Sequence, residues 1–181
     1  MEFERLTIPD VVLVKPKVLG DVRGWFFESW EARKFASAGL DAAFVQDNYS
    51  CSVQGTLRGL HYQILKPQGK LVRVTAGEVF DVAVDIRRSS PSFGKWVGTI
   101  LSGDNKHQLW VPPGFAHGFY VLSESAEFFY KCSDFYAPEH ERTLRWDDPS
   151  LGIVWPLEGR VPLLSAKDQH GKALADADCF P

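Results

Sequence analysis

Short apolar segments that alternate with clusters of turn residues run through most of the chain. From Phe44 onward, such clusters fall at residues 52–55, 66–69, 76–77, 89–92, 102–105, 112–114 and 123–125. Short strands at this regular spacing are typical of a β-sandwich or β-barrel. The pattern therefore predicts a mainly β fold.

The first forty residues are predicted to contribute two strands and one helix. Val11–Val14 and Trp25–Glu28 are the predicted strands, and Gly20-Asp21 marks a turn before the second. Glu31–Ala38 is predicted to be helical, because Gly39 supplies the stop signal that commonly ends a helix. A short helix is therefore expected ahead of the barrel strands.

Side-chain parity gives the predicted strands two faces, since residues two apart point to the same side. Lys70, Val72 and Val74 share a face, which is consistent with a lysine that points into a partly apolar barrel. The other sets are Asp81, Ala83 and Asp85, with Phe80, Val82, Val84 and Ile86 opposite them, and Phe128, Tyr130 and Cys132. An interior that holds Tyr130 beside Lys70 and His61 would be a reaction cavity. The alternative for Tyr130 is a cross-strand packing aromatic, and parity alone does not decide between them.

Length and composition fit one domain, 1–181, because 45% of the 181 residues are hydrophobic and neither a repeat nor a linker divides the chain. The tail from Asp147 is expected to wrap the barrel as loops and short helical turns. The formal net charge of -3 argues against a nucleic-acid or general membrane binder, although a local basic cluster is compatible with one small anion. No apolar run approaches the roughly 20 residues that span a bilayer, so a cytoplasmic location is expected.

The three cysteines, Cys51, Cys132 and Cys179, are odd in number and scattered along the chain. This arrangement suggests neither a disulfide framework nor a CxxC metal site. Free thiols are expected, with Cys132 packed in a strand.

The segment Arg58–Gln63, followed by Gln68-Gly69-Lys70, places a base and a cation in one predicted β-hairpin. A histidine such as His61 takes and gives a proton near neutrality, and Lys70 offers a positive charge for an anion formed in a reaction. The alternatives are a half-buried strand histidine and a solvated edge lysine. Polar groups flanked by glycines in an apolar β pattern cost stability unless they are used, which favours proton-transfer chemistry.

A second cluster, Pro112–Phe119, contains Pro-x-Gly-x-x-His between two predicted strands. It resembles the second motif of the cupin superfamily, in which this turn delivers a histidine into a small antiparallel barrel. Metal-binding cupins add a His-x-His pair and a Glu, whereas this chain has His61 followed by Gln63 and no Glu at ligand spacing. The three-ligand metal site is therefore incomplete. The remaining histidines, His107, His140 and His170, are expected in solvated loops.

An ordered series of blocks makes the resemblance more specific. They lie at residues 21–28, 44–50, 57–63, 68–70, 81–87, 112–119, 130–131, 136–139 and 165–168. In this order they resemble the dTDP-4-dehydrorhamnose 3,5-epimerase family. The resemblance implies a cupin-type antiparallel β-barrel (jelly roll) with a few short helices, and a homodimer that exchanges N-terminal strands.

The family's substrate is a dTDP-linked 4-keto-6-deoxy sugar, whose carbonyl acidifies the hydrogens at C3 and C5. By analogy with the family, His61 is the base, Asp168 orients it and makes it more basic, Lys70 stabilises the oxyanion, and Tyr130 is the acid. Asp168 otherwise reads as a solvated loop carboxylate. No metal or other cofactor is implied, and the product belongs to dTDP-rhamnose biosynthesis.

The resemblance also implies a substrate-binding set. Arg23 and Arg58 match the family's anion-contacting arginines, which suits bidentate recognition of a diphosphate. Arg23 and Glu28 are expected from the partner subunit. The other implied contacts are Gln46, Asp47 and Asn48 around the nucleotide, His117 at the sugar or phosphate, Tyr136 stacked on the thymine, and Glu141 and Lys167 in the polar shell.

Several functions remain open on the sequence. A non-catalytic sugar-binding cupin would keep the barrel and arginines, but it has no use for an acid and a base on opposite faces of one pocket. A metal-dependent cupin oxygenase needs the missing ligands. The nearest alternative is a family member that inverts C3 or C5 alone, or that acts on another dTDP-4-keto sugar.

Overall fold

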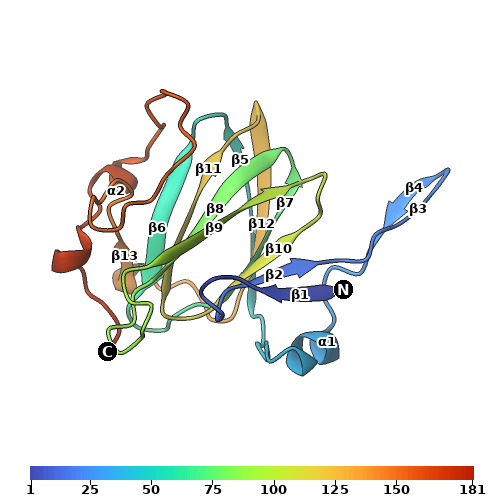
Figure 1. Cartoon of the computed structure of the whole chain (residues 1–181), viewed down its shortest axis with the longest axis horizontal. Helices are drawn as coiled ribbons and strands as arrows, with labels where there is room; N and C mark the ends of the chain where they lie inside the picture. Colours follow the sequence, from blue (N-terminus) through green and yellow to red (C-terminus); the bar gives the residue numbers. More distant parts are fainter.

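Two antiparallel sheets form the body of the protein in the computed structural model, which describes residues 1–181 (Figure 1). The strands of the six-stranded sheet, in spatial order, are β1 (Glu2–Arg5), β2 (Val12–Lys15), β10 (Gln108–Val111), β7 (Lys70–Ala76), β12 (Ser125–Cys132) and β5 (Gln46–Val53). Those of the five-stranded sheet are β13 (Glu141–Thr143), β6 (Leu57–Gln63), β11 (Phe115–Val121), β8 (Glu78–Asp85) and β9 (Trp96–Ser102). The prediction of a mainly β fold is confirmed.

The largest hydrophobic core lies between the two sheets. It includes Val72 and Val74 from β7, Ala83 from β8 and Phe128 from β12. Val82, Val84 and Ile86 pack instead on the other side of the five-stranded sheet. These positions confirm the two faces predicted from side-chain parity, because a strand directs alternate residues to opposite sides.

Each sheet is also covered on its outer face. Helix α1 (Ala32–Ser37) packs Phe35 against the six-stranded sheet. The C-terminal segment covers the five-stranded sheet with residues that include Leu151 and Trp155, and it carries helix α2 (Ala166–Gln169) past β6 and β13 (Figure 1). Two single turns of 3-10 helix complete the chain, η1 (Pro138–His140) and η2 (Leu174–Asp176).

The helix predicted over Glu31–Ala38 is confirmed, with Glu31 as its N-cap and Ala38 as its C-cap. The predicted free thiols are also confirmed, and Cys132 is buried in β12. Strand β1 was not expected, because only Phe3 among its residues is apolar and partly buried. It forms the edge strand of the six-stranded sheet, and Phe3 is the side chain that packs it against the core.

The segment around residue 25 differs from the prediction. Strands β3 (Leu19–Asp21) and β4 (Gly24–Phe26) form a two-stranded hairpin, so Asp21 lies in a strand and Glu28 lies beyond one. The hairpin projects away from the barrel (Figure 1). Its turn is at residues 22–23, where the chain passes from Asp21 to a left-handed Gly24 with φ of 132°.

The predicted hairpin between the His61 and Lys70 segments is wrong. Strand β6 pairs with β11 and β13, whereas β7 pairs with β10 and β12 in the other sheet. The connection at residues 64–69 is long enough to cross the roughly 10 Å between facing sheets. His61 and Lys70 therefore project from opposite walls of the barrel rather than from neighbouring strands.

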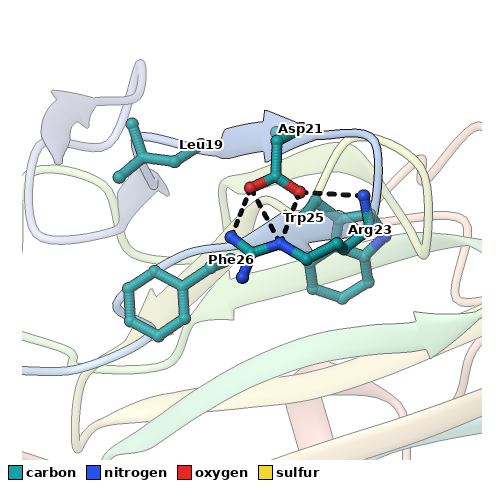
Figure 2. A pocket seen from close by; sticks show the side chains of 7 residues that line it. Leu19, Asp21, Arg23, Trp25 and Phe26 are labelled. Atoms are coloured by element: carbon teal, nitrogen blue, oxygen red, sulfur yellow. Dashed lines mark hydrogen bonds and ion pairs between the residues drawn. The ribbon is translucent and has the colours of Figure 1, made fainter.

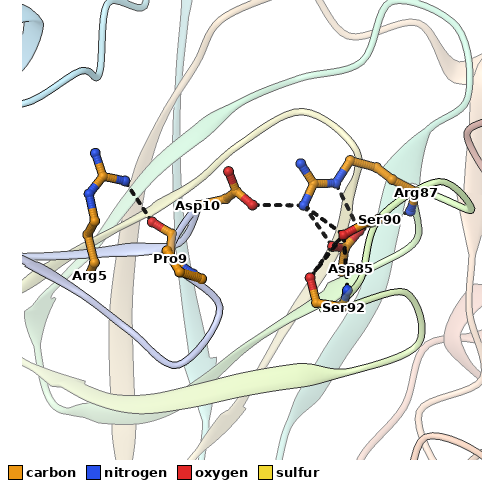
Figure 3. Close-up of polar contacts among 7 residues, drawn as sticks. All are labelled: Arg5, Pro9, Asp10, Asp85, Arg87, Ser90 and Ser92. Atoms are coloured by element: carbon orange, nitrogen blue, oxygen red, sulfur yellow. Dashed lines mark hydrogen bonds and ion pairs between the residues drawn. The ribbon is translucent and has the colours of Figure 1, made fainter.

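A buried carboxylate ties the end of β8 to two loops (Figure 3). Asp85 has no exposed side-chain surface and accepts hydrogen bonds from Arg87, Ser90 and Ser92, at distances of 2.6 to 3.0 Å. Arg87 also reaches Asp10 in the β1–β2 loop at 2.9 Å. Burial alone opposes ionisation, but these donors lower the pKa of Asp85 to about 2.

We expect Asp85→Asn to lower the free energy of unfolding by roughly 2 to 4 kcal/mol near neutral pH, because it removes the charge on which three side chains converge. The folded state depresses the pKa of Asp85, so its contribution is present above the ordinary value and is lost as the pH falls toward about 2. The gap between wild type and variant should therefore narrow in acid, as measured by urea unfolding. Asp10→Asn, the control, removes only an exposed pair and should cost less than about 1 kcal/mol; equal losses would contradict this account.

Candidate active site

A cavity of about 410 Å³ opens inside the barrel, between the two sheets. Its walls combine charged, amide and aromatic side chains. Those predicted from the sequence are Gln46, Asn48, Arg58, His61, Lys70, His117, Tyr130, Tyr136, Glu141 and Lys167. The others are Tyr49, Ser50, Gln68, Phe119 and Phe128.

A short polar contact joins His61 in the cavity wall to Asp168. The His61 Nε2 atom lies 2.6 Å from Asp168 Oδ1, and Asp168 is only 3% exposed. Burial raises the pKa of Asp168, but His61, Ser165 and the Gly59 N–H more than offset it and hold that pKa at about 2. Asp168 is therefore an anion that fixes the ring of His61, and it is not a solvated loop residue.

The imidazole of His61 is set up to receive a proton. Burial lowers the pKa of His61 below its ordinary value, although the contact with Asp168 acts in the opposite direction. The ring is therefore neutral near pH 7, as a general base must be. Asp168 faces it from α2, where Ser165 caps the helix and donates its hydroxyl hydrogen to Asp168 Oδ2 at 2.6 Å.

Lys70 and Tyr130 reach the cavity from the opposite wall, on β7 and β12 of the six-stranded sheet. Lys70 Nζ lies 3.5 Å from the carbonyl oxygen of His61. Burial lowers the pKa of Lys70 and raises that of Tyr130 to about 12. The phenol therefore keeps its proton at neutral pH, so it has one to donate.

A second histidine–carboxylate pair lines the same cavity. His117 Nε2 lies 2.9 and 3.0 Å from the two oxygens of Asp81, which is fully buried. His117 sits directly opposite His61 in the β11–β6 register. The two strands approach closely here, since a Cβ on Gly59 would lie 2.6 Å from the Cα of Gly118.

Polar side chains on neighbouring elements complete the walls. Gln46 donates to Asn48 at 3.1 Å, and both project inward from β5. Arg58 Nε donates to Ser52 Oγ at 3.0 Å, which directs the guanidinium. These groups offer a cation and several hydrogen-bonding partners at one side of the cavity.

At the rim, three side chains from separate segments are linked. Lys167 Nζ lies 2.7 Å from Glu141 Oε1, and the Tyr136 hydroxyl donates to Glu141 Oε2 at 3.0 Å. Burial raises the pKa of Glu141, but Lys167 and the Tyr136 hydroxyl reverse this, and the net shift is downward. The exposed ring of Tyr136 offers a flat surface at the cavity mouth.

Three predicted binding residues lie outside the cavity of this chain. Asp47 points to the outer face of β5, because it alternates with Gln46 and Asn48, and there it pairs with Lys131 at 2.9 Å. Because Asp47 faces away from the cavity, its expected contact with the nucleotide is not supported. Glu28 also lies outside the cavity and pairs with Lys34 at 2.6 Å.

Arg23 lies on the projecting hairpin, where it pairs with Asp21 at 2.5 Å (Figure 2). This hairpin lines a depression of about 470 Å³. One exposed hairpin forms this depression, and its only charged pair is Asp21 with Arg23. We therefore assign the chemistry to the barrel cavity.

Some functional positions were missed in the sequence. Ser50 could have been found from its parity with Gln46 and Asn48, as Phe119 could from its parity with His117. Parity grouped Asp81 with Ala83 on one face of its strand but gave neither the direction of that face nor a partner for the carboxylate. No local pattern signals Ser165 as a ligand of Asp168.

No group of three or more His, Cys, Asp and Glu side chains is arranged to hold a metal ion. His61 and His117 each contact one carboxylate, Asp168 and Asp81. His107, His140 and His170 do not line the cavity. None of the helices has the length and apolar composition needed to cross a membrane.

The arrangement suits proton removal and return at a carbon beside a carbonyl. A neutral imidazole faces a phenol across the cavity, and the Lys70 side chain lies on the phenol's side. A base, an acid and a cation for the developing oxyanion are the three groups that such chemistry requires.

Comparisons with known proteins agree with this chemistry. The family model for dTDP-4-dehydrorhamnose 3,5-epimerase matches residues 5–176. A dTDP-4-dehydrorhamnose 3,5-epimerase from Pseudomonas aeruginosa is 64% identical over 182 residues, which cover 100% of both chains. At this identity and coverage, the relationship extends through the whole barrel and its tail.

Solved structures share the fold. A dTDP-6-deoxy-D-glucose-3,5-epimerase from Legionella pneumophila, in complex with dTDP-4-keto-L-rhamnose, is 54% identical with a TM-score of 0.95, covering 98% of this chain and 94% of that one. A 3'-monoepimerase from Streptomyces bikiniensis, in complex with dTDP-quinovose, is 34% identical with a TM-score of 0.88, covering 94% and 86%. The predicted cupin-type jelly roll is confirmed. The chain belongs to the dTDP-4-dehydrorhamnose 3,5-epimerase family.

Proposed function

We propose that His61, Lys70 and Tyr130 carry out the epimerisation that defines this family. The chain is an isomerase that converts dTDP-4-dehydro-6-deoxyglucose to dTDP-4-dehydrorhamnose in dTDP-rhamnose biosynthesis. The observation that carries the assignment of roles is the placement of the His61–Asp168 pair and Tyr130 on opposite walls of one cavity. Inversion at carbon needs a base on one face of the sugar and an acid on the other.

Each inversion follows the same sequence of bond changes. His61 removes the hydrogen from C5 or C3, and the electron pair of that C–H bond moves to form an enolate with its charge on the C4 oxygen. Lys70 stabilises this oxyanion. Tyr130 then gives its proton to the carbon from the other face, and the C4 carbonyl is restored. Asp168 stabilises the imidazolium that forms on His61 in the first step. Exchange with solvent then takes the proton from His61 and returns one to Tyr130, which resets both groups for the next inversion.

The remaining cavity residues bind the nucleotide in this proposal. Arg58 contacts the diphosphate, which suits a guanidinium. His117, directed by Asp81, meets the sugar or phosphate. Tyr136 stacks on the thymine, and the other polar contacts come from Gln46, Asn48, Glu141 and Lys167.

The homodimer with exchanged N-terminal strands is part of the same proposal. Arg23 and Glu28 lie outside their own cavity, and the hairpin that carries Arg23 projects from the barrel with Trp25 60% and Phe26 68% exposed. Exposed aromatic side chains that lie together commonly mark a surface that a partner protein covers. The partner's cavity is the place we propose for Arg23 and Glu28. We also propose that residues 1–181 act as one domain and that the enzyme is cytoplasmic.

The second candidate function is that of a monoepimerase, an enzyme that inverts C3 or C5 alone. It is kept because the Streptomyces bikiniensis 3'-monoepimerase has the same fold, so the fold does not separate one inversion from two. Incubation of this chain with dTDP-4-keto-6-deoxyglucose in deuterated water tests it. NMR should find deuterium at both C3 and C5, whereas label at one carbon would establish the monoepimerase.

We expect His61→Ala to slow exchange at both carbons by about a hundredfold to ten-thousandfold, the usual cost of losing a general base. Circular dichroism should find the variant folded, because His61 is a partly exposed cavity residue. His107→Ala is the matched control, since His107 lies outside the cavity, and it should exchange at the wild-type rate. Near-normal exchange in folded His61→Ala would remove His61 from its assigned role.

Tyr130→Phe should separate proton removal from inversion. The phenylalanine keeps the ring and loses only the hydroxyl that gives the proton. His61 still removes a proton and returns one from solvent to the same face, so deuterium incorporation should persist while product formation falls by about a hundredfold or more. Wild-type rates of both would make Tyr130 a packing residue and place the acid elsewhere.

We expect activity to survive exhaustive treatment with a metal chelator, because Lys70 supplies the charge that stabilises the enolate. The measurement is the rate of product formation before and after chelation, with a known metalloenzyme as the positive control. If activity disappears and returns with an added divalent metal, the metal-free mechanism is wrong.

A further inference from the structure

The backbone of the loop that carries Tyr136 is held by three glutamine side chains. This loop, residues 133–137, joins β12 to η1 at the rim of the cavity. The glutamines come from separate parts of the chain: Gln46 on β5, Gln63 on β6 and Gln68 in the connection between the sheets. We call these three residues the glutamine clamp. Exposed rim loops are usually among the least ordered parts of a protein, so bonds of this kind require an explanation.

Gln63 is the buried member of the clamp, with 3% of its surface exposed, and it does not line the cavity. Its Nε2 donates to the carbonyl oxygens of Lys66 at 2.7 Å and Phe135 at 3.2 Å. Its Oε1 accepts from the Ala137 N–H at 2.9 Å. Both amide hydrogens and the amide oxygen are therefore in use.

The other two members bond to the positions in between. Gln68 Nε2 donates to the carbonyl oxygen of Asp134 at 2.9 Å, and Gln46 Oε1 accepts from the Tyr136 N–H at 2.9 Å. Consequently each residue from 134 to 137 has one backbone group bonded to the clamp. The hydroxyl of Tyr136 is fixed separately by Glu141.

We propose that the glutamine clamp fixes the Tyr136 loop before substrate binds, so that the Tyr136 ring is a preformed platform for the thymine base. The members of the clamp are positioning residues, and Gln63 acts only through the loop. The inference rests on the proposed stacking of Tyr136. A loop ordered in advance loses little conformational entropy on binding, which raises affinity.

The clamp also accounts for Gln63 in the sequence. At this position, two residues after His61, metal-binding cupins have a second histidine. To bond both the Phe135 carbonyl and the Ala137 N–H, one side chain needs a hydrogen-bond donor and an acceptor, and it must be long enough to reach the loop. The amide of glutamine supplies both groups. The barrel position is thus used for positioning the binding loop.

Gln63→Met tests the proposal, because methionine keeps the length of the side chain and removes every hydrogen bond. Isothermal titration with dTDP should give a dissociation constant raised by about threefold to tenfold, the range expected from losing one to two net hydrogen bonds. Hydrogen exchange at the amides of residues 133–137 should become faster. The kcat at saturating substrate should stay within about twofold of wild type, since the loop makes no proton transfer.

Gln54→Met is the matched control. Gln54 donates one bond to the carbonyl oxygen of Leu122, at the opposite end of β12 from the Tyr136 loop. The same substitution there should leave dTDP affinity and loop exchange unchanged. If Gln63→Met does not fold, Gln63→Glu keeps the acceptor for Ala137 and loses donors, and it should alter affinity and exchange in the same direction.

Tyr136→Ala separates the two proposals. Weaker dTDP binding in Tyr136→Ala but wild-type binding in a folded Gln63 variant would overturn the clamp and leave the stacking role intact. Unchanged loop exchange in the Gln63 variant would also overturn the clamp. Wild-type binding in Tyr136→Ala would overturn the stacking role, and with it the platform.

Discussion

The contact between Asp168 and His61 makes the interior of the barrel depend on a segment that lies outside it. Asp168 is 107 positions from His61 in the chain. It reaches the contact because the C-terminal segment packs along the five-stranded sheet, bridging Leu163 to Thr56 and Lys172 to Leu144. The apolar packing of this segment on the sheet therefore stabilises the protein and also holds Asp168 in contact with His61.

A barrel interior that contains charges is costly unless each charge has a partner. Here the cost is limited by pairing within the walls: Asp81 contacts His117, and Asp168 contacts His61 and Ser165. Lys70 has the weakest contact of the group, a carbonyl oxygen at 3.5 Å. A lysine with spare hydrogen-bonding capacity beside a cavity is suited to a partner that appears only during the reaction.

Much of the fold followed from the sequence, since alternation is a local property. It pointed Lys70 into the barrel and put Asp81 and Val82 on opposite faces of one strand; the structure shows that the face of Asp81 is the inward one. Pairing between strands is not local, and the mistaken hairpin of β6 with β7 came from treating neighbours in sequence as neighbours in the sheet. Parity also places Asp47 on the face of β5 opposite to Gln46 and Asn48, so alternation and the family resemblance disagree at that position. The approach of Asp168 to His61 had no signature in spacing, and only the resemblance pointed to it.

The position of Asp168 after every strand of the barrel has a consequence for the order in which the site forms. Every strand of both sheets lies between Glu2 and Thr143, whereas α2 begins at Ala166. Because the polypeptide is made from its N-terminus, all the barrel strands are synthesised before the carboxylate that contacts His61. The fixed orientation of the His61 ring is therefore a late feature of the chain, acquired only after the walls that surround the cavity have been made.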